Sequence, residues 1–169
     1  MGTIKPEQGL STLVNHVAEG HNPHHAHVTP IYQTSTFSFP DVATGASIFK
    51  GEEEGYVYTR LANPNQAQLA AKYAVLEGLD LLRSQPDRPV EDVVDAHLFA
   101  TGMAAVTAAI LARVKSGQTI IAQEALYSAT YNFLHDLAPR YGIQVVWLSD
   151  PTRQAWEQAF AAHPDAVLA

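Results

Sequence analysis

The chain has no cysteine among its 169 residues, which excludes disulfides, thiolate metal sites and a cysteine nucleophile. No apolar run is long enough to span a bilayer, and the N-terminus lacks the basic region and apolar core of a secretion signal. A formal net charge of −7 gives no general attraction to nucleic acid or to an anionic membrane. These absences predict a cytoplasmic protein that binds neither nucleic acid nor membrane.

Hydrophobic residues make up 47% of the sequence, which is enough to bury a core. From residue 96 onward, apolar runs and glycine stops alternate between strand and helix patterns. The expected strands are 97–100, 118–122, 143–148 and the start of another at 165–169, with helices from 104 to about 116, 127–141, and from a cap at Asp150-Pro151 to about His163. This alternation predicts an α/β fold with a mainly parallel sheet flanked by helices, in which ligands bind at the carboxyl ends of strands.

Apolar periodicity also predicts which face of each long helix is buried. In the N-terminal half, Asn63 is a good N-cap and Pro64 suits the first helical position of a helix that ends near Gly78. The faces expected to be buried are Leu69, Tyr73 and Leu76; Met103, Val106, Ile110 and Val114; and Leu134, Leu137 and Tyr141.

The stretch His97–Val114 is the centre of this pattern, because a strand turns through Thr101, Gly102 and Met103 directly into a helix. Such a turn leaves free backbone N–H groups at the positive end of the helix dipole, where a phosphate or carboxylate can bind. Most strand–glycine–helix turns are only connections, so this stretch indicates an anion site only in combination with other features.

Two further features could contact such an anion or its carrier. Tyr58 and Arg60 are two residues apart in an extended segment, which places both side chains on one face as a potential phosphate clamp. Tyr127 follows the strand at 118–122, so its ring could stack on a planar cofactor. The alternatives are a surface arginine beside a packed tyrosine and a core tyrosine at a helix start.

Two charged or polar loops carry weaker signals. Residues 20–30 contain four histidines, but their two prolines and close spacing favour an exposed arm over a zinc site, and no metal site is expected. The four are His21, His24, His25 and His27. Residues 83–95 hold two prolines and six charged residues, which is typical of an exposed surface loop.

Three motifs, in this order, give the chain a family resemblance. They are the stretch from PIYQTSTFSF to YVYTRLANPNQ, then ATGMAAV, then ALYSATYNFL. Together they resemble the pyridoxal-phosphate (PLP) enzymes of cysteine and methionine metabolism, from about residue 16 to the end of the chain. That group includes cystathionine synthases and lyases, methionine γ-lyase and O-acetylhomoserine sulfhydrylase, which act on amino-acid substrates.

The resemblance implies a role for each candidate residue. Gly102 and Met103 would donate backbone N–H groups to the PLP phosphate, and Tyr127, the one catalytic residue in the chain, would stack on the pyridine ring. Tyr58 and Arg60 would reach the phosphate held by the neighbouring subunit, so a homodimer, commonly paired into a homotetramer, would share its active sites.

The implied architecture is part of the aspartate-aminotransferase-like (type I) PLP fold. Residues 1–63 would form an N-terminal arm that contributes to the neighbouring subunit, and residues 64–169 the first, incomplete part of the PLP-binding large domain. The Schiff-base lysine, the aspartate that pairs with the pyridinium nitrogen and the substrate-carboxylate arginine lie further along the family's chains. The chain is therefore expected to be the N-terminal segment of a longer lyase or transferase, and to be inactive alone.

Two departures and two alternatives accompany this interpretation. Methionine γ-lyases have a cysteine two residues after the stacking tyrosine, where this chain has Ala129, and the loop at 79–95 is longer than usual. The alternatives are a non-catalytic product that acts only through subunit association, and an unrelated nucleotide-binding α/β domain. The second is weakened because no GxGxxG or GxxxxGK[ST] pattern is present.

Overall fold

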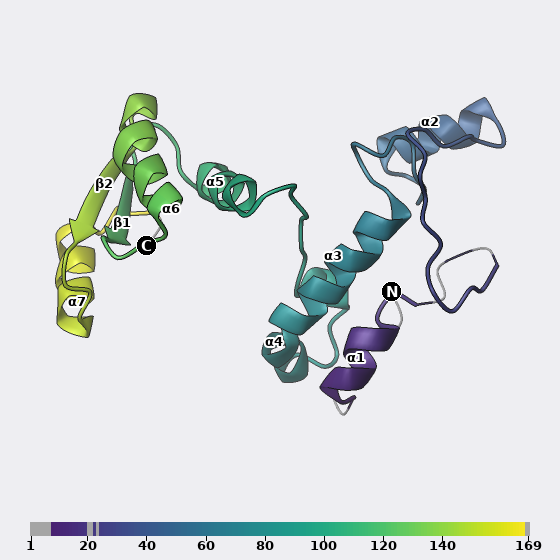
Figure 1. Ribbon diagram of the computed structural model, residues 1–169, viewed down its shortest axis with the longest axis horizontal. Coiled ribbons are helices and arrows are strands. Elements are labelled where there is room, and N and C mark those ends of the chain that lie inside the picture. The colour runs from purple at the N-terminus through teal and green to yellow at the C-terminus, as the bar shows by residue number, and fades with distance from the viewer. Residues whose placement is uncertain (1–7, 20–21, 23, 168–169) are drawn as a thin grey trace. The chain divides into compact units, whose positions relative to one another are not determined.

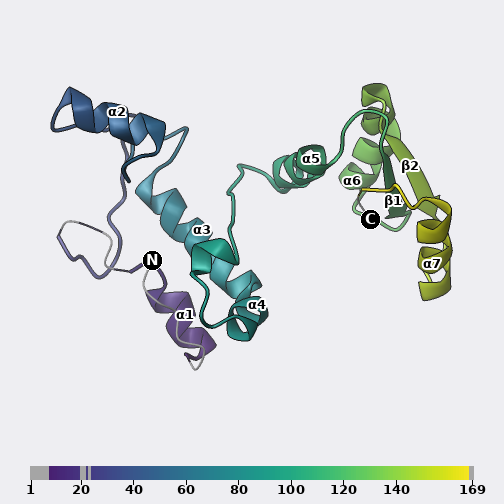
Figure 2. The same ribbon diagram turned by 180° about the vertical axis from the view of Figure 1, so that it is seen from behind.

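The computed structural model describes residues 8–19, 22 and 24–167, and the chain divides into two compact units, Met1–Leu98 and Phe99–Ala169. Figures 1 and 2 show the elements of each unit from two opposite sides. Within the described ranges, no helix is both long and apolar enough to cross a membrane.

The first unit is helical, with an extended arm between its first two helices (Figure 1). Asp41 caps the start of α2 by accepting from the Thr44 N–H, and Gly51 ends that helix in the left-handed conformation, as glycine readily does. Asn63 and Pro64 begin α3 as expected. The elements are α1 (Leu10–His16), α2 (Val42–Lys50), α3 (Pro64–Glu77), α4 (Leu79–Ser84) and the 3₁₀ turn η1 (Val90–Asp92).

The core of the first unit lies on a different face of α3 from the one expected. Leu69 and Tyr73 are 47% and 52% exposed, whereas Ala71, Ala74 and Val75 are buried. The helix carries two apolar stripes, and the stripe of small residues is the one that lets other helices approach closely. Side chains from three helices meet there: Leu13, Val17, Ala71, Val75 and Leu82.

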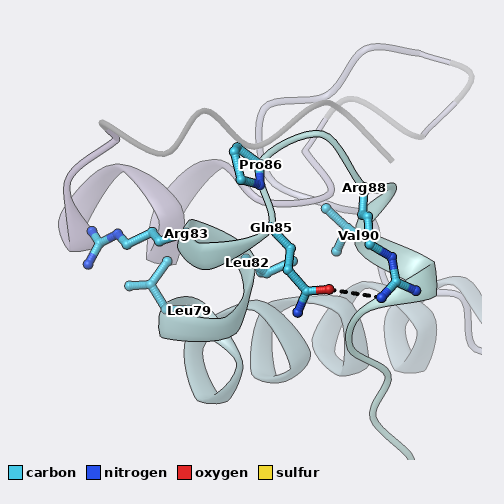
Figure 3. A pocket seen from close by; sticks show the side chains of 7 residues that line it. All are labelled: Leu79, Leu82, Arg83, Gln85, Pro86, Arg88 and Val90. Carbon is cyan, nitrogen blue, oxygen red and sulfur yellow. Dashed lines mark hydrogen bonds between the residues drawn. The ribbon is translucent and has the colours of Figure 1, made fainter.

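Residues 83–95, predicted from composition to be a surface loop, are one only in part, and the longer stretch 79–95 also contains α4. Its charged residues are exposed, but α4 buries Leu82, and Val90, Val93 and Val94 pack against the same core. Figure 3 shows a small cavity lined by side chains of this segment, where the Arg88 guanidinium donates to Gln85 Oε1 at 2.8 Å. The apolar side chains of residues 79–95 therefore cover the hydrophobic face shared by α1 and α3.

The second unit is the expected α/β structure with a smaller sheet. Strands β1 and β2 pair in parallel from Thr119 with Gln144 to Gln123 with Leu148, and the Val167 N–H donates to the Thr119 carbonyl at 3.1 Å. Residues 165–167 form no strand, and residues 168–169 of the strand expected from 165 lie outside the described residues. The elements are α5 (Gly102–Arg113), β1 (Thr119–Gln123), α6 (Ser128–Asn132), η2 (Phe133–Leu137), η3 (Ala138–Tyr141), β2 (Gln144–Leu148) and α7 (Arg153–Ala162).

The prediction of a buried strand at 97–100 is wrong. Residues 96–99 belong to no strand, and Leu98 and Phe99 are 38% and 47% exposed. A strand needs a neighbour to receive its backbone hydrogen bonds, and the described part of the sheet consists only of β1 and β2. The apolar run is therefore extended but unpaired, at the boundary between the two units.

The helical run at 128–141 departs from the expected α-helix in its middle. The Ala138 N–H bonds to the Phe133 carbonyl, five residues back, so η2 is a π-helical turn. Pro139, one residue later, has no N–H to continue an α-helical ladder. The wider turn rotates the buried face to Phe133, Leu134 and Ala138, which leaves the expected Leu137 and Tyr141 exposed.

The core of the second unit lies between α5, the strands and the 128–141 run. Ile110 and Val114 are buried there, with Met103 and Val106 partly buried, which confirms the face expected for α5. This packing fixes α5, and therefore its N-terminus, relative to the loop that follows β1.

Candidate cofactor-binding site

The N-terminus of α5 presents two backbone donors. The Thr101 side chain caps the helix by accepting from the Ala104 N–H at 3.1 Å, and the Thr101 carbonyl accepts from the Ala105 N–H. Within the described part of the chain, the N–H groups of Gly102 and Met103 have no hydrogen-bond partner. Gly102 is exposed and Met103 is partly buried. The pair is suited to bind an anion.

Tyr127 lies just before α6, in the loop that leaves the carboxyl end of β1. Its ring is 70% exposed, so the alternative of a core tyrosine is wrong. Leu126 anchors the loop by packing against the same core as Met103, and the Thr130 hydroxyl contacts Met103 Sδ at 3.7 Å. The structure thus holds the loop of Tyr127 beside the start of α5, although the two are far apart in sequence.

Tyr58 and Arg60 also lie together, in the first unit. The Arg60 guanidinium carbon is 5.2 Å from the centroid of the Tyr58 ring, a cation–π contact. Within the described residues, the guanidinium has no carboxylate partner, so its donors are available to an external anion. The prediction that both residues lie in one extended segment is wrong: the extended segment ends at Tyr58, and Arg60 lies in the turn in which the Leu61 and Ala62 N–H groups donate to the Tyr58 carbonyl.

Polar residues that the sequence reasoning missed hold this segment in place. Asn63, treated above only as a cap, is 3% exposed, and its amide also donates to the Tyr32 carbonyl. Asn65 bonds to the same stretch through Tyr32 and Pro30. The signal available in sequence was a pair of asparagines flanking the proline of a helix start, since asparagine side chains readily bond to nearby backbone.

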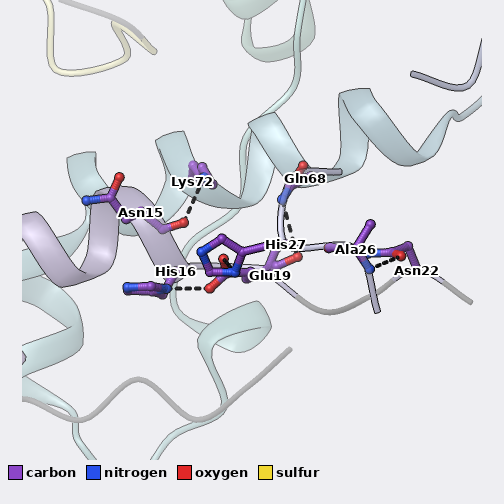
Figure 4. Close-up of polar contacts among 9 residues, drawn as sticks. Asn15, His16, Glu19, Asn22, Ala26, His27, Gln68 and Lys72 are labelled. Carbon is purple, nitrogen blue, oxygen red and sulfur yellow. Dashed lines mark hydrogen bonds and ion pairs between the residues drawn. The ribbon is translucent and has the colours of Figure 1, made fainter. Parts of the chain in front are cut away.

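The described histidines of the segment at 20–30 are exposed, and one of them joins a charged cluster beside α1. The Glu19 carboxylate contacts His16 and forms an ion pair with His27, whose Nδ1 lies 3.1 Å from a carboxylate oxygen. Beside them, the Lys72 ammonium donates to the Asn15 carbonyl (Figure 4). The hydrogen bond from His16 is the main cause of a lowered Glu19 pKa, with the charges of His16, His27 and Lys72 adding to it. His24 and His25 are exposed, and His21 lies outside the described residues.

No group of three histidines, cysteines or carboxylates in the described ranges is arranged to hold a metal ion. The site features are therefore two free amides and an aromatic ring in the second unit, and a tyrosine–arginine pair in the first. Free N–H groups at a helix start bind phosphate, and an exposed ring can cover a planar heterocycle.

The profile of the Cys/Met metabolism PLP-dependent enzymes matches residues 11–169. The chain belongs to this family. It is 37% identical over 160 residues to an L-methionine γ-lyase of Porphyromonas gingivalis, covering 95% of this chain and 36% of that protein. It is 38% identical over 124 residues to an O-acetyl-L-homoserine sulfhydrylase of Leptospira meyeri, covering 72% of this chain and 25% of that protein. The alternative of an unrelated nucleotide-binding domain is wrong.

Solved structures show the same fold. The MetB protein of Corynebacterium glutamicum matches with a TM-score of 0.71 at 23% identity, over 98% of this chain and 37% of that one. A Campylobacter jejuni protein assigned as an O-acetylhomoserine (thiol)-lyase matches with a TM-score of 0.70 at 24% identity, over 87% of this chain and 32% of that one. The chain therefore spans about a third of the length of the relatives it matches.

Proposed function

We propose that residues 1–169 form the N-terminal part of a PLP-dependent lyase or transferase that acts on a sulfur amino acid or an activated homoserine. The observation that carries this proposal is the pair of free amides at Gly102 and Met103, whose helix start lies beside the loop that carries the exposed Tyr127, within one unit. The donors suit the phosphate and the ring suits the pyridine, so the residues present fit the cofactor.

Each residue has a definite task in this proposal. The Gly102 and Met103 N–H groups bind the phosphate, and Tyr127 covers the ring and fixes its plane. When bound, PLP supplies an electron sink for bond cleavage next to the amino group of the substrate. The chain's own contribution is to hold that cofactor in one orientation.

The first unit is proposed to serve a neighbouring subunit. Residues 1–63 form an arm that brings Tyr58 and Arg60 to the phosphate held by the partner of a homodimer, which itself pairs into a homotetramer. The free guanidinium beside Tyr58 supports this, because a planar fork of donors binds phosphate in two places at once.

The lysine that binds the cofactor covalently is proposed to lie beyond residue 169. Of the four lysines in the chain, Lys72 donates to Asn15 and Lys115 follows the far end of the helix that starts at the anion site. The Campylobacter jejuni protein carries its pyridoxylated lysine at position 205 of its own chain. Residues 1–169 alone are accordingly expected to have no lyase or transferase activity.

One residue bears on which member of the family the enzyme resembles most in activity. Ala129 stands where methionine γ-lyases carry a cysteine, which favours a transferase or another lyase over a strict methionine γ-lyase. The similarity to methionine γ-lyases and to a sulfhydrylase is of the same size, so overall identity does not decide between them.

The test replaces one phosphate donor without disturbing the helix. Proline is tolerated at the first helical position, and Thr101 already has the extended conformation that a following proline requires. Gly102→Pro in the full-length enzyme should therefore remove one N–H and weaken PLP binding, by about 1.5–3 kcal/mol for a bond to a charged group. Cofactor titration of the apoenzyme measures this.

Arg153→Pro is the matched control, because Arg153 is the first residue of α7 and Thr152 before it is also extended. This variant should bind PLP as the wild type does. Equal affinity of Gly102→Pro and wild type would contradict the assignment of the phosphate site.

A further inference from the structure

Residues 30–37 belong to the arm between α1 and α2. They form no helix and have almost no strand partner. One antiparallel bridge joins Thr36 to Tyr58, through bonds from the Phe37 N–H to the Val57 carbonyl at 3.1 Å and from the Thr59 N–H to the Ser35 carbonyl at 2.9 Å. A single bridge is weak compared with a ladder of several bonds. Other contacts must hold the rest of the arm.

Asn65 holds the arm's backbone as a neighbouring strand would. Its side-chain oxygen accepts from the Tyr32 N–H at 2.8 Å, and its side-chain nitrogen donates to the Pro30 carbonyl at 2.8 Å. One carboxamide therefore binds an N–H and a C=O of the same extended segment, and ties that segment to the first turn of α3.

Asn63 connects three pieces of the first unit. Its side-chain oxygen accepts from the Asn65 N–H at 2.9 Å, which caps α3. Its side-chain nitrogen donates to the Tyr32 carbonyl at 3.0 Å and to Thr59 Oγ1 at 3.3 Å. The Thr59 hydroxyl in turn donates to the Thr34 carbonyl. A buried amide that makes all three bonds leaves no buried side-chain donor unpaired.

Thr59 lies between the two residues that carry the proposed phosphate contact. Since its backbone N–H bonds to Ser35 and its hydroxyl bonds to Thr34 and Asn63, the orientation of Tyr58 and Arg60 depends on this network. The cap alone does not require asparagine, because serine and aspartate cap helices equally well. The two donated bonds do require it, since neither alternative offers an NH₂ group at that reach.

We propose that Asn63 is a positioning residue for the cofactor phosphate, acting through Thr59 on the Tyr58–Arg60 pair. This inference rests on the proposed function, in which Arg60 contacts that phosphate. Asn65 supports Asn63 by fixing the arm segment onto which the second amide bond is made.

The decisive variant is Asn63→Ser, which keeps a cap on α3 and removes the two donated bonds. In the full-length enzyme its PLP dissociation constant should rise roughly three- to ten-fold, the range expected for lost neutral hydrogen bonds. Arg60→Ala should raise it roughly ten-fold or more. If Asn63 acts through Arg60, adding Asn63→Ser to Arg60→Ala should change the constant by less than about two-fold.

The control is Asn15→Ser, because Asn15 is exposed and its amide bonds only within α1, to the Ser11 carbonyl. It should leave cofactor affinity unchanged. Thr59→Val is a second variant, which removes the hydroxyl at nearly constant shape and should raise the PLP dissociation constant as Asn63→Ser does. It replaces Asn63→Ser in the test if that variant does not fold.

Hydrogen exchange supplies a readout that does not involve the cofactor. The Tyr32, Phe37 and Thr59 amides should exchange faster in Asn63→Ser than in the wild type, while those of α2 keep their rates. Additive effects of Asn63→Ser and Arg60→Ala on affinity would overturn the inference, as would unchanged exchange at the three amides. If Arg60→Ala alone leaves affinity unchanged, the proposed phosphate contact fails instead.

Discussion

The extended segments inside the two units of the chain are held by different kinds of hydrogen bond. In the second unit, backbone pairs between β1 and β2 run from Thr119 to Gln123 and continue at both ends, from Gln144 to Gln118 and from Glu124 to Leu148. In the first unit, the arm has one bridge and is otherwise bound by side chains, among them those of Asn63, Asn65 and Thr59. Backbone pairing tolerates many substitutions, whereas a side-chain amide can be lost through a single one.

This difference matches the task proposed for each unit. The second unit offers backbone N–H groups to the phosphate, and those donors are fixed by the packing of α5 on a continuous core. The first unit offers the Arg60 side chain, whose position depends on polar contacts of an arm. The phosphate contacts proposed for the two units therefore depend on different kinds of bond.

The largest expected effect is on the sheet of the second unit. Ile121 in β1 is 0% exposed, so Ile121→Ala should cost about 2–5 kcal/mol of unfolding free energy through lost burial and the cavity left behind. Denaturant unfolding measures the loss. Hydrogen exchange should locate it in residues 99–167, and equal loss of protection in the first unit would show that the two units are not independent.

The next effect probes the added segment of the first unit. A β-carbon at Gly78 would lie 2.1 Å from Val94 Cγ1 and 3.0 Å from the Ala74 carbonyl oxygen. Gly78→Ala should therefore push Val94 out of the core and cost about 1–3 kcal/mol, as overpacking usually does. Gly9→Ala is the control, because a β-carbon there meets nothing within 4 Å. A melting temperature of Gly78→Ala equal to that of the control would mean that the segment does not pack as described.

The smallest effect concerns the charged cluster of α1 and the arm. The Glu19 pKa is lowered in the folded chain, chiefly by the hydrogen bond from His16, so ionised Glu19 stabilises the fold above its ordinary pKa of 4.5. That contribution is lost as the pH falls through the lowered pKa. The melting-temperature difference between wild type and Glu19→Gln should therefore be present near pH 6 and shrink toward pH 3.

Glu53→Gln makes the same charge change at an exposed position without an ion pair among the described residues, and serves as its control. The role of the cluster would be contradicted if the melting-temperature difference between wild type and Glu19→Gln stayed constant from pH 6 to pH 3. It would also be contradicted if Glu53→Gln gave the same pH-dependent difference.

Sequence reasoning was most reliable where the local pattern carries the information. The cap at Asn63, the helix end near Gly78, and the alternation of β1, β2 and their helices follow from short-range signals. It failed where tertiary context decides: which of two apolar stripes of α3 is covered, where the turn before Pro139 widens, and whether residues 97–100 find a strand partner.

The candidate site divides in the same way. Gly102 and Met103 could be predicted as donors, because a turn into a helix leaves amides free whatever surrounds it. The second role of Asn63 could not be predicted, because its partners Tyr32 and Thr59 are brought to it only by the path of the arm. Long-range polar contacts of this kind leave no periodic trace in sequence.

The most direct test of the account asks whether the two units of different subunits build one site. Subunits with Arg60→Ala and subunits with Gly102→Pro are co-expressed with different tags, and the hybrid dimer is isolated and titrated with PLP. If Arg60 serves the neighbour's phosphate, each hybrid has one site with both Arg60 and the Gly102 N–H intact, and should bind one equivalent of PLP with wild-type affinity. If all sites of the hybrid bind as weakly as those of the single variants, Arg60 acts within its own subunit or not on the phosphate, and the account is wrong.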